Sequence, residues 1–287
     1  MENLNLIKNL ETIGKKYESE HLSIWENSQL KMDSWTALKF FFNHSFMRGR
    51  RDKLSVEYYT FTVKVLEQDK LFENLKNSKD NNLFNTDIIR KLKKEKRNSI
   101  EHERFDLEVK QKNSLINALT TEIEVDVEFP KDIHYKKNIC IQNDTDLLMV
   151  LDTLNFISEE HEKQNIYNYF YNLIDTGDFK RAHNELINLS GVGDKLSTFF
   201  LRDIAIINGT KITAKQIEFI FPVDTWVAQI TTLISDKKFS ADKPNDIKEY
   251  YIKNFHDSNF PLIAAGLWYL AYNSLEYAIQ YVKAYKI

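Results

Sequence analysis

Glycine and proline are scarce in this chain, and that scarcity is the strongest constraint on its fold. Only seven glycines and four prolines occur among 287 residues, so few positions would interrupt a helix. Leu, Lys, Glu, Asn and Ile are abundant, and 43% of the residues are hydrophobic, which is enough to form a buried core. We therefore expect an all-α fold with room for one short β element.

Apolar residues recur at helical spacing along most of the chain. Residues 1–30 are expected to form one or two amphipathic helices, and residues 259–282 one buried final helix. Residues 121–129 alternate and are β-branched, which favours a short strand. Residues 70–115 are highly charged, with six Lys or Arg and one Glu between Arg90 and Arg97. We expect them to form either a solvent-exposed helical insertion or a lobe that contacts phosphates.

The composition argues against several classes of protein. The single cysteine, Cys140, excludes both an intrachain disulfide and a cysteine-ligated iron–sulfur cluster. The histidines are scattered without an HExxH pattern, so we expect no catalytic metal. The N-terminus lacks the apolar run of a signal peptide, and the longest apolar stretch, 260–272, is too short to cross a bilayer. We expect a cytoplasmic protein, associated with the nucleoid if the source is a prokaryote.

The most informative segment is the turn that runs from Leu189 to Lys195 between two apolar-periodic helices. Its sequence is Leu-Ser-Gly-Val-Gly-Asp-Lys. Gly191 and Gly193 are expected to adopt positive φ and to allow a close approach of another molecule. Their amides and the start of the following helix would form a sequence-independent site for a DNA phosphate. Val192 would anchor the turn in the core.

A carboxylate occurs downstream, in the segment Phe221-Pro-Val-Asp224. Asp224 stands where a helix from Thr225 to about Ile234 would begin, so it is either an N-cap or an ionised group aimed at a reacting centre. Lys195 likewise has two interpretations. It is either an exposed residue that contacts phosphate or, as a neutral amine, a nucleophile.

Together these two segments resemble the helix-hairpin-helix DNA glycosylases, a family that includes endonuclease III and the 8-oxoguanine glycosylases. The family pattern is Leu-x-Gly-Val-Gly-x-Lys followed by Val-Asp-x-His, and the resemblance is strong over about residues 185–230. The matching residues are Leu189, Gly191, Val192, Gly193, Lys195, Val223 and Asp224. Trp226 stands where the pattern has His. The spacing from Lys195 to Asp224 is longer than in endonuclease III and closer to the cluster-free archaeal 8-oxoguanine branch.

The resemblance implies a fold and an activity. The fold would have two helical lobes with the active-site cleft between them. One lobe would span 34–206, including the charged insertion and the helix-hairpin-helix motif at about 179–206, and the other would combine 1–33 with 207–287. Lys195 would attack C1′ of the sugar with help from Asp224, so the enzyme would excise a damaged base, such as 8-oxoguanine, and cut the strand as a lyase.

The resemblance also implies partners and a base pocket. The partner would be double-stranded DNA and not a membrane, the protein would be a monomer, and it would lack an iron–sulfur cluster. The hairpin would be compatible with a structural monovalent ion. The candidates for the base pocket or for the wedge that fills the vacated space are Asn43, Arg48, Phe199, Trp226 and Trp268.

A purely structural role remains open for these residues, because arginines can cap the C-terminus of a helix and aromatic residues at helical spacing often belong to a core. Two other functions also remain open. One is a non-catalytic helix-hairpin-helix nucleic-acid-binding protein, and the other is a glycosylase for another modified base.

Overall fold

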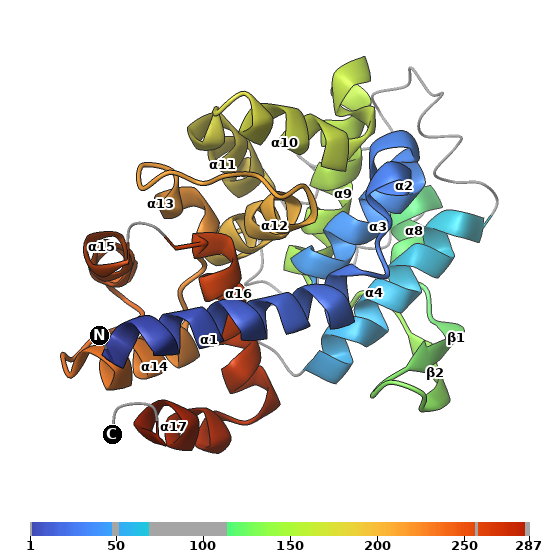
Figure 1. Cartoon of the computed structure of the whole chain (residues 1–287). Helices are drawn as coiled ribbons and strands as arrows, with labels where there is room; N and C mark the ends of the chain where they lie inside the picture. The colour runs from blue at the N-terminus through green and yellow to red at the C-terminus, as the bar shows by residue number, and fades with distance from the viewer. Residues whose placement is uncertain (1, 48–51, 69–113, 256–257, 285–287) are drawn as a thin grey trace, which may run out of the picture. The chain divides into compact units, whose positions relative to one another are not determined.

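A computed structural model of the chain describes residues 2–47, 52–68, 114–255 and 258–284. The described chain is mostly helical, and its one sheet has two strands (Figure 1). This confirms the predicted mostly-α fold with one short β element. In the described part of the chain, no helix combines the length and the hydropathy that crossing a membrane requires.

The chain divides into two compact units. The first consists of Met1–Leu30, Phe170–Leu186 and Gly193–Ile287, and the second of Lys31–Tyr169 and Ile187–Val192. The N- and C-terminal segments thus belong to one unit. The helix that follows the glycine-containing turn belongs to that same unit, whereas the sequence assigned it to the lobe 34–206.

The first unit consists of helices and loops and has no strand in its described part. Its helices are α1 (Glu2–Tyr17), the π-helix η1 (Glu18–Leu22), the second half of α10 (Ile166–Asp175), most of α11 (Phe179–Asn188), α12 (Asp194–Ile207), α13 (Ile217–Ile220), α14 (Thr225–Ser235), α15 (Pro244–Asn254), α16 (Phe260–Asn273) and α17 (Leu275–Ala284). The apolar helix α16 packs against α1, α12, α14 and α17 and is therefore the centre of this unit.

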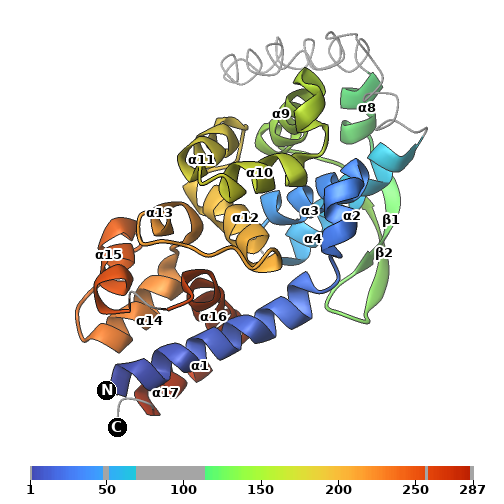
Figure 2. The same ribbon diagram turned by 45° about the horizontal axis from the view of Figure 1, so that its top comes forward.

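Two glycines set the distance between α1 and α16, which cross in close contact (Figure 2). A Cβ atom added at Gly14 would overlap the carbonyl oxygen of Leu262, and one added at Gly266 would overlap the carbonyl oxygen of Leu10. The two backbones therefore touch directly, because neither position leaves room for a side chain.

The C-terminal apolar segment forms two helices and not the single helix predicted for 259–282. Asn259 caps α16 by accepting the Leu262 N–H. The helix ends at Asn273, and the next residue, Ser274, has an extended backbone (φ −171°, ψ 113°). The Ser274 hydroxyl then accepts the Tyr277 N–H at 3.2 Å and starts α17. The prediction was wrong here because a serine that bonds the backbone locally competes with helix continuation.

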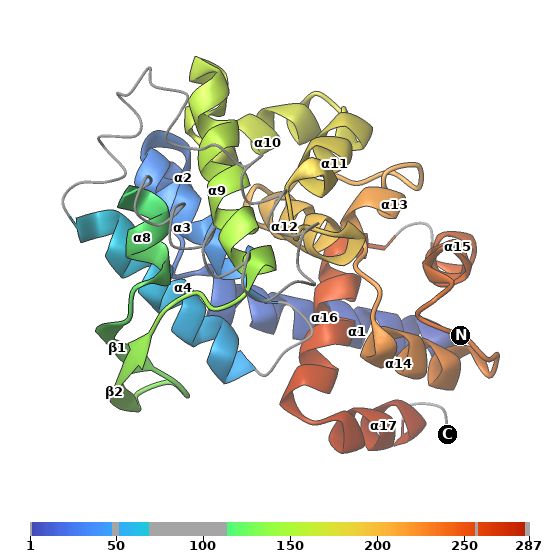
Figure 3. The same ribbon diagram turned by 180° about the vertical axis from the view of Figure 1, so that it is seen from behind.

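The second unit holds the sheet. Its elements are the end of α2 (Asn27–Met32), α3 (Ser34–Ser45), α4 (Asp52–Glu67), α8 (Ser114–Thr120), β1 (Ile123–Glu128), β2 (His134–Ile139), α9 (Asp144–Glu159), the 3₁₀ helix η4 (His161–Gln164) and the start of α10. Strands β1 and β2 pair antiparallel, with Ile123 opposite Ile139, and β1 packs on α4 (Figure 3). The strand predicted for 121–129 is confirmed. Its partner β2 was not predicted, because its charged sequence lacks the alternation of a half-buried strand.

Most of the charged insertion, from 70 to 113, lies outside the described residues, and so does Arg48. Lys195 and Asp224 both belong to the first unit.

Replacing Gly14 by Ala should lower the free energy of unfolding by about 3 kcal/mol, since the methyl group would force the α1 and α16 backbones apart. Urea unfolding measures this change. Gly193→Ala is the matched control and should unfold like the wild type, because an added Cβ there meets no atom within 4 Å. Equal stability of the two variants would contradict the direct backbone contact.

Candidate active site

The turn between α11 and α12 has the compact geometry expected from its sequence. The Val192 N–H donates to the Leu189 carbonyl oxygen at 3.0 Å, and Gly191 adopts φ 76°, the left-handed region that favours glycine. The side chains of Leu189 and Val192 are buried. Asp152 of α9 accepts the Ser190 N–H at 3.1 Å. The turn is thus anchored by two apolar side chains and one carboxylate.

Gly193 differs from the prediction that it would adopt positive φ. Its φ is −96° and its ψ is −179°, an extended conformation in which it serves as the N-cap of α12 without a side chain to bond the helix. The space that a Cβ would occupy is open. The start of α12 therefore presents backbone amides that no side chain caps, beside a residue that leaves room for another molecule.

Asp224 is the N-cap of α14, as one of the two interpretations of the sequence predicted. Its Oδ1 atom accepts the backbone N–H groups of Trp226 and Val227, each at 3.0 Å. Its side chain is only 14% exposed. These two hydrogen bonds fix the orientation of the carboxylate, and its second oxygen, Oδ2, is not used by the helix cap.

Lys195 meets that second oxygen. Its Nζ atom lies 3.2 Å from Oδ2 of Asp224, and its side chain is 47% exposed. Lys195 stands in the first turn of α12 and Asp224 at the start of α14, so two helix starts in one unit bring the pair together. Asp224 therefore uses Oδ1 to cap α14 and Oδ2 to pair with Lys195.

The chemical capacity of this pair follows from its geometry. An ammonium group is not nucleophilic, but a carboxylate at hydrogen-bond distance can accept its proton. The partial exposure of Lys195 leaves its amine within reach of a bound molecule. An anchored carboxylate is also placed to stabilise positive charge that develops beside it.

Two of the aromatic pocket candidates lie together in the first unit. Phe199, one helical turn after Lys195, is buried, and its ring centroid lies 5.6 Å from that of Trp268 on α16. Trp268 is half-buried and stacks on Tyr272 at 4.7 Å with an interplanar angle of 18°. Trp226 is half-buried in the first turn of α14, directly after Asp224.

The remaining wedge candidate that the structure describes, Asn43, lies half-buried on α3 in the second unit. Its role and that of Arg48 stay predictions.

Sequence reasoning missed a buried polar group beside Phe199. Arg202 and Asp203 are fully buried, and the Arg202 Nε donates to Oδ1 of Asp203 at 2.8 Å. The Tyr17 hydroxyl donates to Oδ2 of Asp203 at 2.6 Å, and burial and this carboxylate raise the pKa of Tyr17. The guanidinium carbon of Arg202 lies 4.3 Å from the Phe199 ring centroid. An Arg-Asp pair inside the apolar helix Asp194–Ile207 was the available signal, since buried charges need partners.

No set of three or more His, Cys, Asp or Glu side chains is arranged to hold a metal ion in the part of the chain that the structure describes. A monovalent ion at the hairpin stays a prediction.

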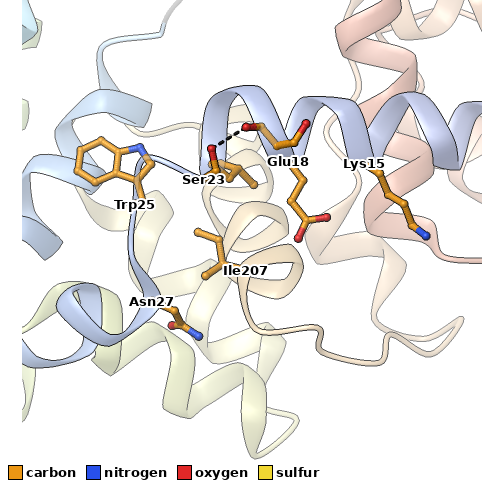
Figure 4. A pocket seen from close by; sticks show the side chains of 8 residues that line it. Lys15, Glu18, Ser23, Trp25, Asn27 and Ile207 are labelled. Carbon is orange, nitrogen blue, oxygen red and sulfur yellow. Dashed lines mark hydrogen bonds between the residues drawn. The ribbon is translucent and has the colours of Figure 1, made fainter.

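A separate open cavity of about 410 Å³ lies where α1 and η1 meet the end of α12 (Figure 4). It is lined by Lys15, Glu18, Ser19, Leu22, Ser23, Trp25, Asn27 and Ile207. Lys195 and Asp224 are absent from this lining. The cavity is therefore distinct from the lysine–aspartate pair.

Comparison with known proteins names no activity for this arrangement. No family model matches the chain, and no solved structure matches it. Over 97 residues, or 33% of the chain, it is 31% identical to an uncharacterized protein of Methanocaldococcus jannaschii. The aligned part covers 22% of that protein's length. A proposal of function therefore rests on the geometry of the site and on the sequence motifs.

The two roles of Asp224 can be separated by substitution. Asp224→Asn should leave the free energy of unfolding nearly unchanged, because Asn caps helices as well as Asp and the half-exposed ion pair adds little stability. Asp224→Ala should lower it by about 1 kcal/mol. Urea unfolding provides the measurement, and Asp33→Ala, which removes the two-amide cap of α3, is the matched control. A large loss of stability in Asp224→Asn would show that the charge, and not the cap, holds this helix start.

Proposed function

We propose that this protein is a bifunctional DNA glycosylase and abasic-site lyase that uses Lys195 as its nucleophile. The observation that carries the proposal is the 3.2 Å contact between Lys195 Nζ and an Asp224 oxygen that the cap of α14 leaves available. A protein that only bound phosphate would need the lysine charge but not a fixed carboxylate beside it. The helix-hairpin-helix motif supplies the expected substrate class, double-stranded DNA.

The reaction would begin when Asp224 takes a proton from the Lys195 ammonium. The neutral amine then forms a bond to C1′ of an extruded nucleotide, and the glycosidic C1′–N bond breaks. The base leaves with the bonding electrons and takes up a proton. The C1′–O4′ bond of the sugar ring then breaks, O4′ keeps the bonding electrons and takes up a proton from the Lys195 nitrogen, and an imine joins Lys195 to C1′.

Loss of a C2′ proton from this imine expels the 3′ phosphate and cuts the strand. Water then hydrolyses the imine and restores the lysine. Asp224 serves both as a proton acceptor and as a fixed negative charge beside the cationic sugar.

The substrate would be held by two further features. The uncapped amides at the start of α12, beside the open space at Gly193, suit a DNA phosphate of any sequence. The aromatic side chains Phe199 and Trp268 suit a flat base, and we propose an oxidised purine such as 8-oxoguanine as the excised base.

Borohydride reduction tests the covalent step, because it converts the imine into a stable protein–DNA adduct visible on a denaturing gel. The wild type should form this adduct with duplexes that contain an abasic site or 8-oxoguanine, and Lys195→Gln should not. Lys215→Gln, which removes an exposed lysine between α12 and α13, is the control and should still react. If the wild type forms no adduct with any such duplex, or if Lys195→Gln forms one, the mechanism is wrong.

Gly193→Ala tests the phosphate site. The fold should tolerate the variant, whereas the affinity for undamaged duplex should fall about tenfold, the equivalent of one lost charge-assisted hydrogen bond. Fluorescence anisotropy with a labelled duplex measures the affinity. Unchanged affinity in the folded variant would remove the start of α12 from the DNA-binding surface.

A further inference from the structure

Arg202 on α12 is a buried cation that the proposed mechanism does not use. Its side chain is fully buried, and its Nε and Nη2 atoms lie 2.8 and 2.7 Å from Oδ1 of Asp203. The Nη1 atom is buried as well, and it has no hydrogen-bond partner among the residues that the structure describes. Leaving buried donors without an acceptor costs free energy, and a ligand that brings an acceptor recovers it.

Aromatic rings surround this guanidinium group. Its central carbon lies 4.3 Å from the Phe199 ring centroid and 5.0 Å from that of Tyr17. The Trp268 ring contacts both rings, at 5.6 Å from Phe199 and 5.9 Å from Tyr17. All four residues belong to the first unit, and Trp268 is the most exposed of them. This cluster combines stacking surfaces with unused N–H donors, which suits a flat ring that carries a carbonyl oxygen.

The cluster lies along the same face of α12 as the proposed nucleophile. Positions 195, 199 and 202 all belong to this helix, and their spacing places the three side chains within about 60° around its axis. Arg202 follows Lys195 by two turns, a distance of about 10 Å along the axis. The base of a nucleotide whose C1′ meets Lys195 would therefore extend past Phe199 towards Arg202.

We propose that Arg202 recognises the 6-carbonyl oxygen of the extruded purine, so that the enzyme selects 6-oxopurines over 6-aminopurines. The inference rests on the proposed function, because it places C1′ of a nucleotide at Lys195. In a purine, C8 adjoins the nitrogen that bonds to C1′, whereas C6 belongs to the ring farther from the sugar. Two helical turns separate Arg202 from Lys195, so Arg202 lies on the side of position 6.

The chemistry at position 6 explains the selection. A 6-carbonyl oxygen accepts hydrogen bonds from the Nη1 donors, whereas a 6-amino group is itself a donor and leaves them unused. The rings of Phe199 and Trp268 are 5.6 Å apart. A base stacked between them needs about 7 Å, which is two van der Waals distances. Binding therefore displaces one ring, and the displacement of Trp268 disturbs the least buried member of the cluster.

A structural role would make Arg202 only the partner of Asp203. That role accounts for the contacts of Nε and Nη2, but it gives Nη1 nothing to do. A neutral pair of similar shape would serve the fold equally well, because burying two charges is itself costly. The two roles are separable, since the structural role depends on the balance of charge and recognition depends on the guanidinium group.

The test compares the excision of two bases that differ at position 6, 8-oxohypoxanthine and 8-oxoadenine, from otherwise identical duplexes. Single-turnover rates are measured on denaturing gels. Arg202→Met/Asp203→Asn removes both charges and keeps an acceptor for the Tyr17 hydroxyl. Its preference for 8-oxohypoxanthine should be about thirtyfold lower than that of the wild type, the equivalent of one hydrogen bond to a charged donor. Differences in duplex stability cancel, because every variant meets the same duplexes.

Two controls isolate the guanidinium group. Asp203→Asn retains Arg202 and should keep the wild-type preference, as should Arg181→Met, which removes an exposed arginine from α11. Urea unfolding should give the double variant a midpoint close to that of the wild type. If the folded double variant keeps the preference, or if Asp203→Asn loses it to the same extent, the proposal is wrong.

A second measurement needs no variant. Titration of the wild type with each free base, followed by tryptophan fluorescence, should show 8-oxohypoxanthine binding about thirtyfold more tightly than 8-oxoadenine. Equal affinities, or no binding of either base, would contradict the proposal even if the double variant does not fold.

These outcomes are distinguishable from failure of the proposed function. An abasic duplex has no base to recognise. A wild-type protein that forms the borohydride adduct with this duplex, but has no preference at position 6, contradicts only the role of Arg202. A wild-type protein that forms no adduct and excises neither base contradicts both.

Discussion

The two oxygens of the Asp224 carboxylate make different interactions, one with the start of a helix and one with Lys195, and the candidate site depends on both. Oδ1 accepts two backbone amides at the start of α14, while Oδ2 lies 3.2 Å from the Lys195 ammonium. A carboxylate held only by a flexible ion pair would have no fixed direction. Because the helix start fixes Asp224, the lysine has a defined partner, which is the preorganisation that proton transfer requires.

The ion pair itself contributes little to folding, since Lys195 is half exposed and solvent screens the interaction. The two residues are held in position by the packing of helices in the first unit. Helix α16 packs against both α12 and α14, which carry the two residues, and against α1 through the glycine contact. The relative position of Lys195 and Asp224 thus depends on a core of apolar helices and not on the attraction between them.

Local patterns in the sequence were sufficient for much of this architecture. The scarcity of glycine and proline predicted the helical fold, and the Gly-Val-Gly turn predicted a hairpin with a buried Val192. Both interpretations of Asp224 were local as well, and the structure shows that its cap leaves an oxygen available to Lys195.

The features that escaped prediction depend on contacts between distant segments or on competition between local bonds. Tyr17 meets Asp203 across most of the chain length, because the two residues are 186 positions apart in the sequence. The extended φ of Gly193 escaped because a glycine tolerates several backbone conformations equally well. The break at Ser274 reflects a hydroxyl that bonds the next helix rather than extending the previous one.

The assignment of Lys195 as the nucleophile is tested by finding which residue becomes covalently attached to DNA. After borohydride reduction of the wild type bound to an abasic duplex, nuclease and protease digestion followed by mass spectrometry identifies the modified residue. We expect a reduced sugar remnant on the Nζ atom of Lys195. A remnant on another lysine or on the terminal amine would contradict the assignment of the nucleophile.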